Sequence, residues 1–80
     1  HVFMGDLDYV CPPADRAAFE TGMKGKGTSW RMTIYGNVKH SYTNPDCTIL
    51  ADPNLAYDAA AATHSWQAMA ELFRDVFAQP

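Results

Sequence analysis

Hydrophobic positions in the first half of the chain predict a strand, a helix and a second strand. An apolar run from His1 to Met4 is stopped by Gly5, which is typical of a strand buried on both faces. Residues 13–23 begin with proline, which the first turn of a helix accommodates well, and carry acidic side chains on one side. Ser29–Tyr35 alternates with period two and predicts a strand with one face drier than the other.

The clearest element is the last one, a long amphipathic helix. Asp58 is a suitable N-cap residue, and the pattern predicts a helix from there to about Ala78. The apolar positions recur at helical spacing and form one stripe, made of Ala62, Trp66, Met69, Ala70, Phe73, Val76 and Phe77. This stripe predicts a buried core face and not a cofactor site.

The order strand, helix, strand, helix predicts an α/β fold built on a right-handed parallel βαβ unit. A parallel sheet needs helices on both faces, and a sheet of two strands is marginal by itself. We therefore expect residues 1–80 to form a single partial domain, a βαβα piece with the last two strands of a larger sheet. More chain elsewhere, or further copies of this chain, would complete that sheet.

Composition excludes several classes of function. The hydrophobic fraction of 48% and the charged fraction of 19% suit a folded chain and not a disordered one. The basic residues do not cluster, so neither nucleic acid nor a membrane surface is an expected partner. The two cysteines, without CxxC spacing, predict free thiols in a cytoplasmic protein. Histidines and cysteines match no ligand spacing, so we expect no metal and no cofactor.

Two residues with complementary chemistry follow the two predicted strands. Asp8 comes shortly after the first strand and His40 shortly after the second. Carboxyl ends of adjacent parallel strands lie about 4.8 Å apart at the edge where open α/β sheets bind ligands. A carboxylate there can accept a hydrogen bond from an imidazole and stabilise the imidazolium formed in general-base catalysis. Asp before His is also the chain order of the α/β-hydrolase triad.

Three segments resemble the dienelactone hydrolase family of α/β-hydrolases. The first, GDLDYVCPPADRAAFE, resembles its Gly-x-x-Asp loop and proline-started helix, which makes Asp8 the acid instead of Asp6. The second, YGNVKHSYTNP, resembles its strand-Gly-loop-His segment, with Tyr42 two residues past the histidine. The third, LAYDAAAATHSWQAMAELFRDVF, resembles its final helix. The segments occur in the family's order and cover nearly the whole chain.

The resemblance implies hydrolysis of an ester or lactone, with Asp8 and His40 as catalytic residues and Tyr42 as a candidate substrate contact. The family's nucleophile, a Cys or Ser in a G-x-[CS]-x-G turn, lies upstream together with the oxyanion donors, and the chain has no such motif. Since an Asp-His pair alone should give little rate enhancement, we expect a nucleophile-bearing N-terminal segment as partner. The thiols of Cys11 and Cys47 are more consistent with packing.

Two main classes of function remain. In the first, the chain is a hydrolase fragment that acts on a small ester or lactone once its nucleophile is supplied. In the second, it is a non-catalytic βαβα module, a gene remnant that self-associates or binds a partner through its exposed strand edge. A third, weaker alternative is a dimer that uses the Asp8 and His40 loops as a small-molecule pocket.

Overall fold

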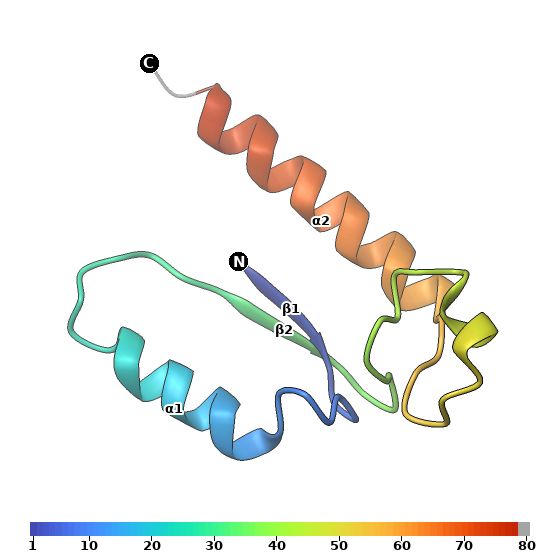
Figure 1. Cartoon of the computed structure of the whole chain (residues 1–80). Coiled ribbons are helices and arrows are strands. Elements are labelled where there is room, and N and C mark those ends of the chain that lie inside the picture. Colours follow the sequence, from blue (N-terminus) through green and yellow to red (C-terminus); the bar gives the residue numbers. More distant parts are fainter. Residues whose placement is uncertain (79–80) are drawn as a thin grey trace.

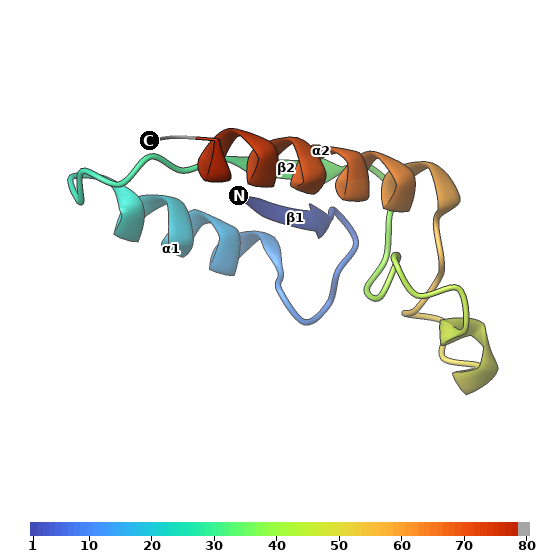
Figure 2. The same cartoon turned by 90° about the horizontal axis from the view of Figure 1, so that it is seen from above.

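The computed structural model describes residues 1–78, and its elements follow the predicted order (Figure 1). The elements are strand β1 (Val2–Gly5), helix α1 (Pro13–Met23), strand β2 (Met32–Tyr35), the short 3-10 helix η1 (Cys47–Leu50) and helix α2 (Ala59–Phe77). Figure 1 shows α1 and α2 on opposite sides of the strands, and Figure 2 shows the segment with η1 projecting beyond the carboxyl ends of the strands. The predicted βαβα fold is confirmed.

β1 and β2 are parallel and form a sheet in which Val2 pairs with Met32 and Gly5 with Tyr35. β2 begins later than the alternating pattern predicted. The reason is that β1 provides no partner before Val2, whose N–H donates to the carbonyl of Arg31 at 2.8 Å. Within residues 1–78, no strand lies against the outer edge of β1 or of β2.

The core of the described chain is small and lies where α2 begins. Its buried residues come from the connection between β2 and α2 and from the first turns of α2, and they are Val38, Tyr42, Cys47, Ala61, Ala62 and Ser65. Tyr35, at the end of β2, packs against this cluster. Asp58 caps α2 by accepting a hydrogen bond from the N–H of Ala61 at 2.9 Å. The best-packed part of the molecule therefore adjoins the carboxyl ends of the strands.

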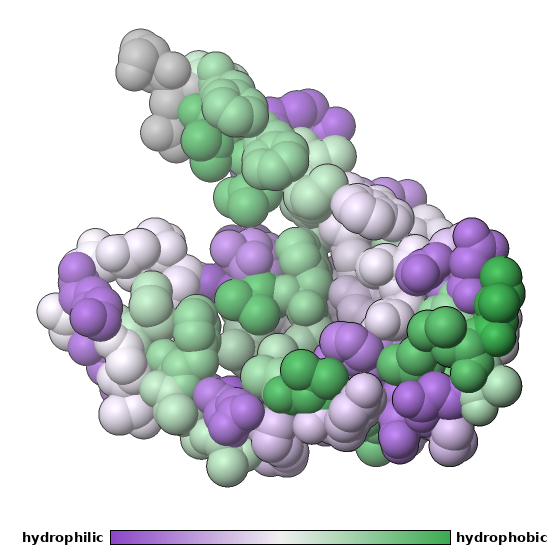
Figure 3. Space-filling view, viewed as in Figure 1, coloured by the Kyte–Doolittle hydropathy of each residue, from purple (hydrophilic) through white to green (hydrophobic). Residues whose placement is uncertain are grey.

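The predicted apolar stripe of α2 is not the face that is buried. Trp66 is 54% exposed and Phe77 is 80% exposed, and Ala62 is the one member of the stripe that is fully buried. The buried face lies further round the helix, where the small residues Ala61 and Ser65 allow a close approach to the core. The prediction of a Trp66 core was thus wrong for residues 1–78. Figure 3 shows large apolar side chains of α2 uncovered, with a hollow between that helix and the rest.

Gly5 determines how closely the loop after β2 approaches the end of β1. A Cβ atom on Gly5 would overlap the backbone carbonyl of Val38 and lie 3.0 Å from the carbonyl oxygen of Lys39. The same Val38 carbonyl accepts a hydrogen bond from the N–H of Leu7 at 2.9 Å. A glycine at this position therefore lets the two strand-end loops share a backbone hydrogen bond.

Replacing Gly5 with Ala is expected to destabilise the fold by about 1–3 kcal/mol, because the new methyl group must displace backbone atoms and not a flexible side chain. Urea unfolding measures the change. Gly36→Ala is the matched control, since a Cβ atom there meets nothing within 4 Å. Equal unfolding midpoints for the two variants would contradict the close approach at Gly5.

Candidate active site

Asp8 is held in the loop that follows β1 by one hydrogen bond of its backbone and one of its side chain. Its N–H donates to the carbonyl of Gly5 at 3.2 Å, and its Oδ1 accepts the N–H of Val10 at 2.8 Å. A carboxylate that bonds the backbone two residues ahead is a common way to fix a tight loop. The Asp8 side chain is only 15% exposed, and its second oxygen, Oδ2, remains for another partner.

His40 lies in the loop that follows β2 and is anchored through its backbone. It forms an isolated parallel bridge with Leu55, and its carbonyl accepts the N–H of Ala56 at 3.4 Å. The next residue, Ser41, has a φ of 63°, a left-handed conformation that is uncommon for residues other than glycine. The chain therefore turns immediately after the histidine.

The structure brings Asp8 and His40 together. Nδ1 of His40 lies 3.0 Å from Oδ2 of Asp8. Because an ionised carboxylate only accepts hydrogen bonds, this contact assigns the proton of the imidazole to Nδ1. The other nitrogen, Nε2, has no hydrogen-bond partner in the described part of the chain, and the His40 side chain is 36% exposed. Nε2 is thus the unpartnered nitrogen of a partly exposed side chain.

The surroundings of Asp8 favour its charged form. Burial alone raises the pKa of the carboxyl group. The hydrogen bond and charge of His40, with the N–H groups of Val10 and Cys11, outweigh burial and lower the pKa below its ordinary value of 3.8. A carboxyl group can stabilise an imidazolium ion at neutral pH only when it is ionised, as the lowered pKa of Asp8 ensures.

Stability is expected to depend on pH through Asp8. A lowered pKa in the folded chain means that the unfolded chain takes up the proton first as the pH falls. The stability that Asp8 contributes is therefore complete above about pH 5 and is lost as the pH falls through the lowered pKa. The urea midpoint of the wild-type chain should fall more between about pH 5 and pH 3 than that of Asp8→Asn. Parallel curves would contradict the lowered pKa.

Asp6, the other acid of this loop, has a different partner. Nη2 of Arg16, on α1, lies 3.3 Å from Oδ1 of Asp6, and Nη1 donates to the Asp6 carbonyl at 3.4 Å. The Arg16 side chain is well covered, whereas that of Asp6 is 46% exposed. This ion pair ties α1 to the loop and leaves the His40 contact to Asp8.

Tyr42, the candidate substrate contact, lies in the core. Its ring is 7% exposed, and its hydroxyl group is 2.6 Å from Oγ of Ser65, which in turn donates to the carbonyl of Ala61 at 2.8 Å. Burial raises the pKa of Tyr42. The side chain fastens the loop after His40 to α2, so we assign Tyr42 a packing role and do not retain it as a substrate contact.

The two thiols do not complete the pair. Cys47 is buried in the core at the start of η1, and Cys11 is half-buried in the loop before α1. Within residues 1–78 neither is hydrogen-bonded to His40.

Within residues 1–78, no group of three or more potential metal ligands is found, and no helix is long and apolar enough to cross a membrane.

Sequence reasoning missed Tyr9. Its ring lies edge-on to the imidazole of His40, with 5.7 Å between ring centroids and 74° between planes, and the side chain is 55% exposed. An aromatic residue directly after the loop acid was the one signal in the sequence that could have suggested it.

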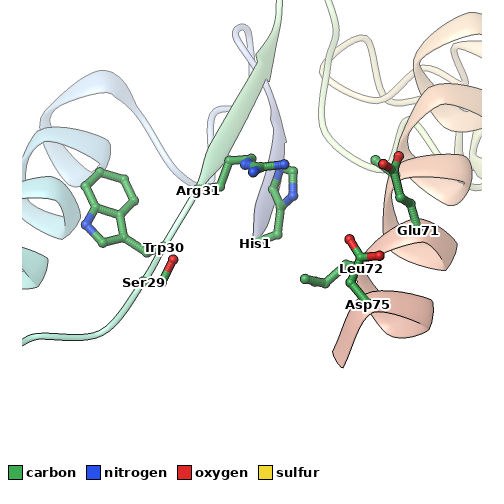
Figure 4. A pocket seen from close by; sticks show the side chains of 8 residues that line it. His1, Ser29, Trp30, Arg31, Glu71, Leu72 and Asp75 are labelled. Atoms are coloured by element: carbon green, nitrogen blue, oxygen red, sulfur yellow. The ribbon is translucent and has the colours of Figure 1, made fainter. Parts of the chain in front are cut away.

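A cavity of about 190 Å³ lies at the opposite ends of the strands (Figure 4). His1 and Arg31 form one wall, and Glu71, Leu72 and Asp75 of α2 form the other. The cavity occurs where α2 diverges from the sheet, and neither residue of the Asp-His pair lines it. Its lining residues therefore take no part in the chemistry of Asp8 and His40.

Comparison with known proteins shows the family of the chain. The family model described as "Dienelactone hydrolase family" matches residues 1–77. The chain belongs to the dienelactone hydrolase family. An uncharacterized protein of Caenorhabditis elegans is 30% identical over 77 residues, which cover 96% of this chain and 49% of that protein.

A solved dienelactone hydrolase-like structure is similar to this chain in both fold and sequence. It is a promiscuous phosphotriesterase from metagenomic libraries, with a TM-score of 0.86 and 32% identity over 92% of this chain and 31% of that one. Both the predicted dienelactone hydrolase membership and the α/β-hydrolase fold are confirmed. The chain spans about half the length of the curated relative and about a third of the solved structure.

Proposed function

We propose that this chain provides the acid and the histidine of a Cys/Ser-Asp-His triad in an ester or lactone hydrolase, and that a nucleophile-bearing segment outside the chain completes the enzyme. The observation that carries the proposal is the 3.0 Å contact between Asp8 Oδ2 and His40 Nδ1, with Nε2 unpartnered among the described residues. Its place at the carboxyl ends of two parallel strands is where α/β sheets hold their ligands. Membership of a hydrolase family supports the same reaction class.

The positions of His40 Nε2 and Asp8 Oδ2 determine the role that we assign to each residue. Nε2 of His40 takes the proton from the incoming hydroxyl or thiol group as that group attacks the ester carbonyl. Asp8 stabilises the resulting imidazolium ion and holds its orientation. The imidazolium then gives the proton to the departing alkoxide, which leaves an acyl-enzyme. Water, activated by the same nitrogen, releases the acid and restores the nucleophile.

Two uncovered surfaces support a completing segment. The outer edge of β1 has no strand against it within residues 1–78, and such an edge is a template for another strand. Helix α2 also leaves large apolar side chains uncovered, and isolated soluble domains seldom expose such a surface. Each of Trp66, Phe73 and Val76 is about half exposed. A segment that adds strands beside β1 and packs on α2 would cover both.

A complementation experiment tests the proposal. The purified chain is mixed with the separately produced N-terminal part of a dienelactone hydrolase family member that carries the nucleophile. We expect hydrolysis of p-nitrophenyl acetate by the mixture and little by either part. The matched control is the same mixture with His40→Gln in this chain. Complex formation without any gain in hydrolysis would rule the proposal out.

The exposed face of α2 also favours a second candidate, a self-associating module without catalysis. Light scattering combined with a thermal melt separates the two. A stable dimer with a cooperative melt that does not bind the nucleophile-bearing part supports the module. A monomer that becomes cooperative only in the complex supports the hydrolase.

A further inference from the structure

We propose that Tyr9 is a positioning residue, whose ring holds the imidazole of His40 in the orientation in which Nδ1 meets Asp8 and Nε2 remains open. This inference rests on the proposed function, because it concerns the same Asp-His pair. It assigns a role to an exposed aromatic residue that neither the fold nor the core requires.

The orientation of the His40 ring needs a second contact. The hydrogen bond from Nδ1 to Asp8, 3.0 Å long, is the one bond to the ring in the described chain. The terminal torsion of a histidine is broad and roughly two-fold, so one bond leaves the ring free to tilt about it. The side chain is 36% exposed and does not belong to the core cluster.

Tyr9 provides that contact by edge-to-face packing. The ring centroids are 5.7 Å apart and the planes are inclined by 74°, a favoured geometry for aromatic pairs. The Tyr9 hydroxyl group has no hydrogen bond within the described range, so the ring and not the hydroxyl group makes the contact. Phenylalanine at position 9 should therefore preserve the contact with His40, and alanine should remove it.

The loop holds Tyr9 in place through Asp8 itself. Oδ1 of Asp8 accepts the N–H of Val10 at 2.8 Å and so closes a turn around Tyr9. One three-residue segment thus restrains the imidazole in two ways, through the carboxylate at Nδ1 and through the neighbouring ring. The 55% exposure of Tyr9 indicates that its truncation will not unfold the core.

The test is the tautomer of His40, read by long-range proton-nitrogen NMR of the full ¹⁵N-labelled chain. Wild type and Tyr9→Phe are expected to show a proton on Nδ1 alone, with widely separated nitrogen shifts. Tyr9→Ala is expected to lose that separation as the ring samples both tautomers. Leu7→Ala is the matched control, because Leu7 is a similarly exposed side chain of the same loop. Retention of the wild-type pattern in Tyr9→Ala would overturn the inference.

Asp8→Asn in the same experiment separates the role of Tyr9 from that of the Asp-His pair. If Asp8→Asn changes the His40 tautomer and Tyr9→Ala does not, the role of Tyr9 fails and the pair stands. If Asp8→Asn has no effect, the pair itself fails and the proposed function fails with it. In the complete enzyme, Tyr9→Ala should lower kcat by on the order of 10- to 100-fold with little change in KM, and Tyr9→Phe should restore it.

Discussion

Replacing His40 with Gln is expected to lower hydrolysis of p-nitrophenyl acetate by the complete enzyme by on the order of 10⁴-fold or more. Glutamine keeps a polar side chain in the loop, but it has no basic nitrogen to take the proton of the nucleophile. The contact with Asp8 Oδ2 can survive as an amide hydrogen bond, so the loop itself should hold. The loss is measured as kcat/KM for the complex of this chain with the nucleophile-bearing part.

His64→Gln is the matched control for this variant. Nδ1 of His64 is hydrogen-bonded to the Tyr35 hydroxyl group at 2.6 Å, at the start of α2 and apart from the Asp8 loop. We expect it to retain hydrolysis, because it does not contact the Asp-His pair. If His40→Gln kept activity within tenfold of the wild type, His40 would not be the base.

Replacing Asp8 with Asn is expected to lower the same rate by on the order of 10⁴-fold. An asparagine can present its NH₂ group to Nδ1 of His40, which places the imidazole proton on Nε2. Nε2 then has no lone pair for the proton of the nucleophile, although the shape of the site is unchanged. Steady-state kinetics of the complex, compared with the His40 tautomer in the free chain, measure both consequences.

Asp6→Asn is the control that distinguishes the two acids of the loop. Asp6 pairs with Arg16 and is partly exposed, and ion pairs of that kind contribute little to stability. We expect an effect of no more than several-fold on hydrolysis. A large loss in Asp6→Asn with a small one in Asp8→Asn would make Asp6 the acid.

The sequence was sufficient to predict the helices and strands and to predict that Asp8 and His40 lie together. Period-two and helical spacing are local properties, so they place β1, α1, β2 and α2 nearly where the structure has them. Asp8 and His40 converge because each follows a strand in a parallel pair, and the topology alone brings such positions together. The start of β2 was misjudged because strand length depends on the partner, and β1 begins only at Val2.

Side-chain environments were less predictable. The α2 stripe was identified as a helical face, but periodicity does not say what covers a face, and residues 1–78 leave Trp66 half exposed. Tyr42 is close to His40 in sequence, yet the left-handed turn at Ser41 precedes a side chain that enters the core. Tyr9 shows the reverse, since its place directly after Asp8 is the one local signal, and that signal does not show that the ring meets His40 across the two loops.

The most direct test of the central claim is a titration of this chain into a fixed amount of the nucleophile-bearing part, with hydrolysis of p-nitrophenyl acetate as the readout. If Asp8 and His40 complete the triad, the rate will rise with added chain and level off at equimolar amounts. If the two parts form a complex and the rate stays at the sum of the separate parts, the chain does not supply the catalytic acid and histidine.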